Sequence, residues 1–505
     1  MNATVSEHPA HEAAVARLDK QLVARGAGER MRFDTHISTV ILAGTHAYKL
    51  KKPVDFGFVD FSTLERRRHF CEREVALNSR FAPELYEAVE SIVDADGEVL
   101  DYAVRMHRFD HAATLDRLVP QGAVTAPAMA AFAGELARIH AQLEPVPDGS
   151  EYGSAATCRE QILATLEPPL EAHVDAALAG GLRDAVGGAH PRFSARQAQG
   201  HVRDCHGDLH LSNIVCHQGR LRAFDCIEFN DSLRVIDTMA DAAFLLMDLD
   251  KYGAHDLGHA FFNAYLEASG DFDGLDLLPL YLAYRSLIRA KVALLGSAAD
   301  AETRAAAHVE LARRYVAPAG RAGLVVTYGL SGSGKSHAAR QLANDAGFLH
   351  LRSDVERRRL AGLDLEDASG STLGGGLYTR QASAATYAHL RDVARRALTA
   401  GFSVVVDAAC LARAQRAPFV AIAHELGVPF HLLWCDAPVA ELERRIQARR
   451  AAGGDPSEAT LEVLAAQRAN AQPPTEIAPA QVVRPDGLAE ALARGALGRT
   501  RMGGS

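Results

Sequence analysis

The sequence predicts two domains, an α+β domain followed by a parallel-sheet α/β domain, and three observations support this. The chain has 505 residues, which is too many for one compact core. Short strand-like runs separated by turns fill the chain up to about residue 106, and segments of helical spacing dominate from 107 to 318. From residue 319 onward, short apolar runs alternate with helical segments, which is the pattern of a parallel sheet with crossover helices.

The small lobe of the first domain is expected at about residues 28–106, after a helix at about 10–26. TVILAGTHAYKLKKPV (39–54) reads as two strands joined by a short turn. STLERRRHFCEREVALNSRFA (62–82) has helical spacing, and AVESIVDADGEVLDYAVRMHRF (88–109) reads as strand, Asp-Gly turn and strand. These segments predict a β-rich lobe with one helix inserted between its strands.

The helical lobe is expected at about 107–318, with one hairpin in it. That hairpin is NIVCHQGRLRAFD (213–225), which reads as strand, Gln-Gly turn and strand. A linker, YVAPAGRAG (315–323), leads to the second domain at 319–497, and residues 498–505 are expected to be a loose tail. The expected parallel strands of the second domain are LVVTY, FLHLRS, FSVVVDA and FHLLWC.

Composition indicates which kinds of binding partner and which cellular compartment to expect. The net charge of −9 gives no support to a nucleic-acid or membrane partner. No run of 18 apolar residues lacks a charge and the N-terminus has no signal-peptide layout, so we expect a cytoplasmic protein. The cysteines show no zinc spacing. Only seven of the 54 basic residues are lysines, and three of them cluster at 49–52, which indicates a specific need for a compact ammonium group.

A phosphate-binding loop is predicted by GLSGSGKS (329–336), which fits G-x-x-x-x-G-K-[ST] between a strand and a helix. Lys335 should reach the β- and γ-phosphates, and the Ser336 hydroxyl should bind Mg²⁺. Backbone amides of the loop should turn toward phosphate oxygens, from Gly329, Ser331, Gly332, Ser333 and Gly334. The alternative is a glycine-rich turn that binds nothing.

Further residues of the second domain suggest a reaction at this phosphate. Asp407 ends the strand VVVDA and is a candidate carboxylate on the Mg²⁺ side. Arg445 and Arg449 lie one helical turn apart and could close over a triphosphate, although a solvated basic face is the alternative. Residues 324–480 resemble the P-loop small-molecule kinases, a group that contains gluconate kinase, chloramphenicol phosphotransferase, zeta toxin and polynucleotide kinase. That resemblance implies Asp354, in D-x-x-R, as the base that orients the acceptor, with both arginines in a lid.

A second constellation lies in CHGDLHLSNIVCHQGRLRAFDCIEF (205–229). Phosphoryl transfer of the kinase type needs a carboxylate for the acceptor hydroxyl, and an amide oxygen and a second carboxylate for the metal. Asp208, Asn213 and Asp225 supply these in order, and the expected hairpin brings Asn213 and Asp225 to one end. The alternative is that Asp208 and Asn213 merely cap a turn.

The HGDLHxxN pattern resembles the aminoglycoside phosphotransferase and choline kinase-like family, a relative of the protein kinases. The resemblance covers about residues 30–315, including CEREVALN and AFDCIEFN. The order of the two domains resembles proteins described as bifunctional aminoglycoside phosphotransferase/ATP-binding proteins. The family resemblance implies a two-lobed, protein-kinase-like fold for the first domain.

The resemblance also implies roles for single residues. Asp208 would be the catalytic base, with Asn213 and Asp225 as Mg²⁺ ligands. The other implied roles concern nucleotide binding. Lys49 or Lys51 would contact the phosphates, with Glu74 or Glu72 as the ion-pair partner of that lysine. RMHRF (105–109), which contains Met106 and Arg108, would be the hinge that binds adenine. A solvated edge strand is the alternative for the lysines. TVILAGTHA lacks the GxGxxG phosphate cover of protein kinases, so the sequence does not define how the nucleotide is held on that side. No Phe-Gly follows Asp225, so the activation-loop machinery of protein kinases is not expected, which favours a small acceptor.

The sequence therefore predicts a phosphotransferase that uses ATP or GTP with Mg²⁺ at two sites and phosphorylates small-molecule hydroxyl groups. One alternative is a single active phosphotransferase domain with the P-loop domain as a regulatory ATPase or ATP sensor. Another is a polynucleotide or protein kinase; the acidic balance and the lack of an aromatic–basic stripe argue against a nucleic-acid substrate. The acceptors and the oligomeric state stay open at this point.

Overall fold

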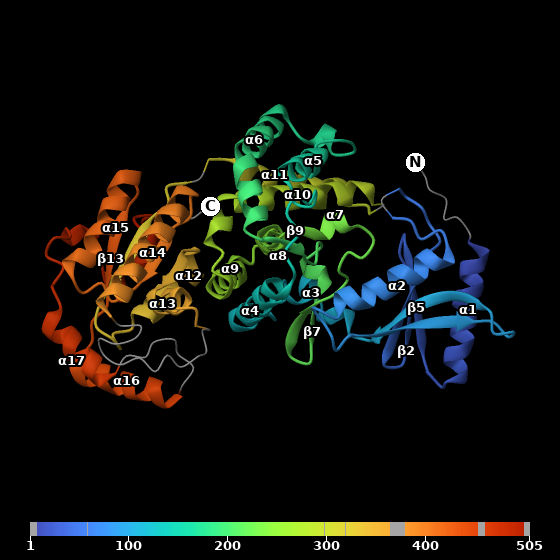
Figure 1. The fold of residues 1–505 in the computed structure, drawn as a ribbon, viewed down its shortest axis with the longest axis horizontal. Coiled ribbons are helices and arrows are strands. Elements are labelled where there is room, and N and C mark those ends of the chain that lie inside the picture. The colour runs from blue at the N-terminus through green and yellow to red at the C-terminus, as the bar shows by residue number, and fades with distance from the viewer. Residues whose placement is uncertain are drawn as a thin grey trace. The chain divides into compact units, whose positions relative to one another are not determined.

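The computed structural model describes residues 8–57, 59–296, 298–318, 320–363, 379–452 and 460–498. All but the first residue of the expected 498–505 tail lies outside this part of the chain. The backbone divides into two compact units, which are described separately. The first unit consists of residues 1–124, 139–161 and 193–248, and the second of 125–138, 162–192 and 249–505. Figure 1 labels the elements of both.

The first unit contains a five-stranded antiparallel sheet in the order β1-β2-β3-β5-β4. Its strands are β1 (Arg30–Asp34), β2 (Ser38–Ala43), β3 (His46–Lys51), β4 (Tyr86–Val93) and β5 (Val99–His107). Helix α1 (Pro9–Ala24) precedes the sheet and helix α2 (Leu64–Asn78) follows β3. The two strand pairs and both helices agree with the segments predicted from the sequence, whereas β1 was not predicted.

The two helices cover opposite faces of this sheet, because side chains alternate along each strand. Ile41 and Tyr48 pack in the cluster that contains α1, whereas Leu42 and Ala47 pack in the cluster that contains Cys71 of α2. The odd-numbered positions of β3 therefore face the α2 side. That places the lysines of this strand beside helix α2.

The first unit also holds a short hairpin, β7 (Ile214–His217) and β8 (Arg220–Ala223), in antiparallel register. Its turn places Gln218 at φ 49° and Gly219 at φ 76°, the left-handed geometry that two-residue hairpin turns need. The amide of Phe224 donates to the carbonyl of Asn213 at 2.9 Å, so Asn213 and Asp225 lie at one end of the hairpin. A second short pair is β6 (Val202–Asp204) with β9 (Val235–Asp237).

Most of the remaining chain before residue 317 is helical. The helices are α3 (Leu115–Leu118), α4 (Ala126–Gln142), α5 (Ala155–Ala164), α6 (Ala176–Ala198), α7 (Asp231–Arg234), α8 (Thr238–Lys251), α9 (His255–Ser269), α10 (Leu278–Leu295) and α11 (Ala301–Val316). The small β-rich lobe followed by helices confirms the predicted two-lobed class. Within the described ranges, no helix is long and apolar enough to cross a membrane.

The second unit contains a five-stranded parallel sheet in the order β11-β12-β10-β13-β14. Its strands are β10 (Leu324–Tyr328), β11 (Leu349–Arg352), β12 (Val404–Asp407), β13 (Phe430–Trp434) and β14 (Val482–Val483). The helices of this part are α12 (Lys335–Ala346), α13 (Ser353–Leu360), α14 (Arg380–Thr399), α15 (Arg413–Leu426), α16 (Val439–Ala452), α17 (Leu461–Asn470) and α18 (Leu488–Ala493). The parallel order confirms the α/β class predicted for the C-terminal domain.

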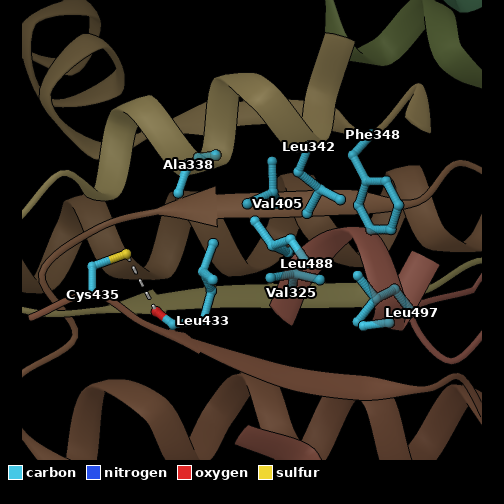
Figure 2. Close-up of a cluster of buried hydrophobic side chains, with 11 residues drawn as sticks. Val325, Ala338, Leu342, Phe348, Val405, Leu433, Cys435, Leu488 and Leu497 are labelled. Atoms are coloured by element: carbon cyan, nitrogen blue, oxygen red, sulfur yellow. Dashed lines mark hydrogen bonds between the residues drawn. The ribbon is translucent and has the colours of Figure 1, made fainter. Parts of the chain in front are cut away.

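One face of the parallel sheet is covered by α12 and the C-terminal segment (Figure 2). Leu342 and Phe348 pack against Val325 and Val405 of the central strands. Every residue of β10 is buried, as expected for a strand with both faces covered. This core fixes the carboxyl end of β10, from which the glycine-rich loop predicted to bind phosphate begins.

Leu342→Ala should lower the free energy of unfolding of this domain by about 2–5 kcal/mol, because it leaves a cavity in a dense core. Trp434, the one tryptophan of the chain, lies in β13, so its fluorescence during denaturant titration follows this domain. Leu360→Ala is the matched control because Leu360 is half exposed, and it should change stability by less than about 0.5 kcal/mol. Equal shifts for the two variants would contradict the assigned core.

Candidate functional site

Two lysines of β3 share one carboxylate of α2. Lys49 Nζ donates to Glu74 Oε1 at 2.8 Å, and Lys51 Nζ donates to Glu74 Oε2 at 2.7 Å. Lys49 also reaches Asp225 Oδ1 at 2.6 Å, whereas Lys51 is fully buried and pairs with Glu228. The structure therefore distinguishes the two lysines: Lys49 contacts Asp225, and Lys51 contacts Glu228.

These charges stabilise one another in a poorly solvated place. Burial would raise the pKa of Glu74, but the two lysines lower it to about 2. Burial raises the pKa of Glu228, although Lys51 opposes the shift. Burial disfavours the charged form of Lys49, yet Asp225 and Glu74 raise its pKa well above the ordinary value. Ionised Glu74 therefore stabilises the fold above its ordinary pKa of 4.5, and this contribution is lost as the pH falls through about 2.

Asp208 and Asn213 are adjacent in the loop before β7. Asn213 Nδ2 donates to Asp208 Oδ2 and to the Asp208 carbonyl, both at 3.0 Å. His210 Nε2 lies 3.3 Å from the same carboxylate, whose side chain is 36% exposed. The amide nitrogen of Asn213 is thus directed toward Asp208, and the carboxylate of Asp208 remains accessible to solvent.

Buried Asp241 of α8 holds the start of this loop. Its carboxylate accepts the amides of His206 and Gly207 at 3.1 and 2.8 Å, and His140 Nε2 lies 3.2 Å away. Gly207 has φ 85°, and a Cβ there would lie 2.8 Å from the Leu233 carbonyl, so only glycine fits. The backbone conformation that positions Asp208 depends on these contacts.

Asp225 has an uncommon backbone conformation, with φ 63°. Its amide donates to the Tyr86 hydroxyl at 3.1 Å, and the next amide, of Cys226, donates to Asn78 Oδ1 at 2.9 Å. Asn78 is fully buried. Two side chains of the small lobe thus fix the direction of the Asp225 carboxylate.

A cavity of about 1240 Å³ lies in the first unit, beside these groups. Val40, Leu42, Met106 and Phe224 give it an apolar wall, and Lys49 and Asp225 line it as well. Lys51, Asp208 and Asn213 are not part of its lining. An apolar cleft that contains an ammonium and a carboxylate can hold the aromatic and anionic parts of a nucleotide.

The predicted hinge residues Met106 and Arg108 also line this cavity. The amide of Arg108, however, already donates to the Thr45 carbonyl at 2.9 Å. A base bound here would have to be recognised by other groups of the hinge.

The glycine-rich loop of the second unit runs from the end of β10 to the start of α12. A Cβ at Gly329 would lie 2.3 Å from the Cys435 carbonyl, and one at Gly332 would lie 2.9 Å from the Leu442 carbonyl. Gly332 and Gly334 have φ of 83° and 91°. Side chains are therefore excluded where the loop contacts its neighbours, and the backbone stays accessible at the cavity beside it.

Lys335, Ser336 and Asp407 meet at this loop. Lys335 Nζ donates to the Leu330 carbonyl at 2.8 Å, and burial lowers the pKa of Lys335. Burial would raise the pKa of Asp407, but hydrogen bonds from His350 and Ser336 lower it to about 2. A hydroxyl and an ionised carboxylate in contact are oxygen donors of the kind that Mg²⁺ prefers.

The arginines predicted for the lid lie at the same cavity, which has a volume of about 410 Å³. Arg445 donates to the Gly332 carbonyl at 3.2 Å and to Glu441 at 2.6 Å. Arg449 has two buried guanidinium nitrogens, Nε and Nη2, without a hydrogen-bond partner among the described residues. Such orphaned donors are costly unless an anion or water meets them. The cavity is therefore suited to a phosphate.

Asp354 in the first turn of α13 and Arg357 in its last turn line the same cavity. Asp354 Oδ1 accepts from Arg357 Nη1 at 3.0 Å. The side chain of Asp354 is 31% exposed, so a ligand in the cavity can reach it.

Helix α9 packs on the edge strand β11 of the same unit. Asn263 accepts the His350 amide at 2.7 Å and donates to the Phe348 carbonyl at 3.1 Å, as a neighbouring strand would. Glu267 Oε1 accepts from Arg352 Nη1 at 2.7 Å, and Arg352 lines the cavity. Side chains of the helical region thus contact the rim of the second site.

Several residues at these sites were not predicted from the sequence. Glu228 lies in the quoted segment AFDCIEFN but received no role, and Asp241 carries no motif. Gln467 of α17 accepts the Ser331 amide at 2.8 Å, and the amides of Gly329 and Ser333 donate to the Ala409 and Leu330 carbonyls, both at 3.2 Å. The prediction that these three amides turn toward phosphate is therefore wrong. Glu72, the alternative to Glu74, pairs instead with Arg68 and is exposed. The apolar spacing of these helices could not have singled out their polar residues.

A family model described as AAA domain matches residues 324–474. The match covers the parallel sheet from β10 to β13 together with the glycine-rich loop. It confirms the predicted resemblance of the second domain to P-loop proteins.

Three mycobacterial proteins are similar to most of the chain. They are the proteins named "Uncharacterized protein" Mb2027c of Mycobacterium bovis and MT2060 and Rv2004c of Mycobacterium tuberculosis. Each is 34% identical over 450 residues, which cover 86% of this chain and 88% of the relative. The similarity thus extends across both domains.

Solved structures of kinases are also similar to parts of the chain. A choline/ethanolamine kinase family protein from Mesorhizobium loti has a TM-score of 0.40 and 16% identity, covering 61% of this chain and 95% of its own. The GDP complex of aminoglycoside 2'-phosphotransferase-IIIa has a TM-score of 0.38 and 14% identity, covering 60% of this chain and 97% of its own. A gluconokinase from Sinorhizobium meliloti has a TM-score of 0.24 and 20% identity, covering 35% of this chain and 89% of its own. Because these scores are low, the fold assignment rests on the strand orders and contacts given above.

Lys51→Met should destabilise the small lobe by about 3–5 kcal/mol, because it leaves Glu74 and Glu228 buried with too little positive charge. Hydrogen exchange of the β3 amides measures the free energy of opening there. Lys52→Met is the matched control: Lys52 pairs with Asp34, which is 41% exposed, at 3.2 Å and should contribute less than about 1 kcal/mol. Equal protection in the two variants would show that the buried pairing is not a stabilising feature.

Proposed function

The chain belongs to the protein family of Mb2027c, MT2060 and Rv2004c, and we propose that it is a phosphotransferase with two sites for ATP and Mg²⁺. Each site would transfer the γ-phosphoryl group to a hydroxyl group of a small molecule. The observation that carries this proposal is that two separate cavities are each lined by a lysine and a carboxylate. These are Lys49 and Asp225 in the first cavity, and Lys335 and Asp407 in the second.

In the first site, Lys49 would hold the nucleotide phosphates while Glu74 keeps the ammonium charged and in place. Asp208 would accept the proton of the acceptor hydroxyl as that oxygen bonds to the γ-phosphorus and the bond to the β-phosphate oxygen breaks. ADP and the phosphorylated acceptor would then be the products. The accessible, hydrogen-bonded carboxylate of Asp208 supports this role.

In the second site, the amides of Gly332 and Gly334, together with Lys335 and Arg449, would surround the phosphates. Asp354 would orient the acceptor. The orphaned nitrogens of Arg449 support an anion at this place. Arg445 is 44% exposed and would close over the nucleotide rather than hold it permanently.

The donor atoms of both sites fit a hard divalent cation. Asn213 and Asp225 lie at one end of the hairpin, and Ser336 is hydrogen-bonded to Asp407. Oxygen donors of this kind suit Mg²⁺ rather than softer metals. When bound, Mg²⁺ would neutralise charge on the phosphates; the proton transfer and the positioning belong to the side chains named above.

A second candidate function keeps one active site and makes the P-loop domain a nucleotide sensor. The contacts of α9 with β11 and Arg352 favour it, because they join the helical region to the rim of the P-loop cavity.

We expect two equivalents of a non-hydrolysable ATP analogue to bind per chain with Mg²⁺, measured by calorimetry. Lys49→Met and Lys335→Met should each weaken one of the two events about 10- to 100-fold, because each removes a charged hydrogen bond. Lys20→Met, which alters an exposed lysine of α1, is the control and should keep both events. Chelation of Mg²⁺ should weaken both. A single event in the unaltered chain would contradict the proposal of two sites.

Asp208→Asn and Asp354→Asn should separate the two reactions. Each change removes a proton acceptor and should slow phosphorylation at its own site by about 10²–10⁴-fold while leaving the nucleotide bound. Products from a mixed metabolite pool, resolved by mass spectrometry, identify which acceptor each site uses. Asp148→Asn, in an exposed turn, is the control. If all products depend on Asp208 while Asp354→Asn changes none, the second site is a sensor and the two-reaction proposal is wrong.

A further inference from the structure

Three potential metal ligands converge at the edge of the first cavity. His46 of β3, Glu87 of β4 and His107 of β5 offer one atom each, and these atoms lie within 4.8 Å of one another. Glu87 and His107 line the cavity. The side chains are 32%, 24% and 46% exposed, so an ion from solvent can reach them. None of them takes part in the phosphotransfer proposed above.

The sheet builds this cluster through two features of its backbone. His46 and His107 are directly opposite in the antiparallel pair of β3 and β5, and their rings stack with centroids 5.3 Å apart. Glu87 lies at a register shift of β4, where Tyr86 pairs with Met106 and Ala88 with Arg105. A bulge of this kind redirects the side chain of the extra residue. The irregularity therefore brings the carboxylate of Glu87 to the histidine pair.

The carboxylate of Glu87 lies close to both histidines, through a different oxygen for each, and the three ligand atoms can meet at one ion after small shifts. Glu87 Oε2 lies 3.4 Å from His46 Nε2, and Glu87 Oε1 lies 3.0 Å from His107 Nε2. Bonds of about 2.0–2.1 Å from a tetrahedral Zn²⁺ place its ligand atoms about 3.3–3.4 Å apart. The other ring nitrogen of His46, Nδ1, lies 3.1 Å from the Thr45 hydroxyl. An oxygen partner on the far nitrogen is the usual support of a metal-binding histidine, since it fixes the ring.

Arg105 is the competitor for this site. Its Nε donates to Glu87 Oε2 at 2.7 Å, and its Nη1 lies 3.7 Å from Glu90. Because Glu90 offers Arg105 a second carboxylate, Arg105 can shift away from Glu87 without becoming unpaired.

We propose that His46 Nε2, His107 Nε2 and the Glu87 carboxylate bind one Zn²⁺, or a similar borderline divalent ion, at the edge of the first cavity. Two imidazoles and one carboxylate are ligands of this class of metal, whereas Mg²⁺ selects oxygen donors. Three protein ligands leave a fourth position for water or for a group of a molecule in the cavity. The site is separate from the oxygen donors assigned to Mg²⁺, and it does not depend on the proposed reaction.

One other cluster has suitable residue types, but it is a structural feature. His140, Cys205 and Asp241 are all buried. The carboxylate of Asp241 already accepts two backbone amides, and the Cys205 thiol donates to the Ile236 carbonyl at 3.5 Å.

The test is titration of the metal-free, full-length chain with Zn²⁺ by calorimetry, in excess Mg²⁺ and without nucleotide. Co²⁺ provides a second readout, because a tetrahedral site gives it intense visible absorption. We expect one equivalent of Zn²⁺ to bind, and His46→Gln and His107→Gln each to weaken it more than tenfold. His111→Gln, at another histidine of the cavity lining, is the matched control and should leave binding unchanged. Arg105→Gln should strengthen binding, since it removes the competitor.

Circular dichroism of each variant establishes that the sheet is folded, so that lost binding reports a lost ligand. The proposal is overturned if the unaltered chain binds no Zn²⁺ above the level of the His46→Gln/His107→Gln double variant. It is also overturned if Arg105→Gln weakens Zn²⁺ binding in a folded chain, because Glu87 would then serve the salt bridge alone.

Discussion

The first unit depends on the ion pairs that the buried Glu74 carboxylate of α2 forms with two lysines of β3. It accepts both Lys49 and Lys51, and these lysines reach Asp225 and Glu228 on the segment after β8. Strand β3 and the segment after β8, which are far apart in the sequence, are thus joined through one buried carboxylate. Because charges taken out of water must be compensated, removing any member leaves another without a partner. The same compensation keeps Lys49 charged at the wall of an apolar cavity.

The lysines of the two candidate sites have different environments. In the first, Lys49 has two carboxylate partners, and its pKa is raised. In the second, Lys335 donates to a backbone carbonyl, and burial lowers its pKa. A phosphate chain would therefore compete with Asp225 for Lys49 but would supply the missing negative charge for Lys335. The orphaned nitrogens of Arg449 point to the same demand. We infer that the second site gains more from an anion than the first.

Much of this arrangement follows from the sequence, and the remainder has physical reasons. The loop of Gly329 to Ser336 and the hairpin after Asn213 could be placed because local turn chemistry dictates them. Lys49 and Lys51 could not be separated, because both point to one face of a strand and only the partners from α2 and the β8 segment distinguish them. Strand β1 does alternate charged and apolar residues, but the run is only five residues long and neither face is buried, so no core-facing side marked it. The pairing of His46 with His107 depends on register between distant strands, which spacing does not reveal.

The linker at 315–323 is not where the packing of the chain divides. Residues 249–318 fall in one compact unit with the P-loop domain, and α9 explains why. An edge strand exposes unpaired amides and carbonyls, and Asn263 bonds the His350 amide of β11 and the Phe348 carbonyl just before it. Arg352, at the end of β11, donates to Glu267 of α9, and this bond holds Arg352 at the cavity. His350, whose amide Asn263 accepts, also contacts Asp407 at 3.2 Å. A shift of α9 would therefore act directly on the groups proposed to hold Mg²⁺ and phosphate, so the helical region and the P-loop domain share one structural element.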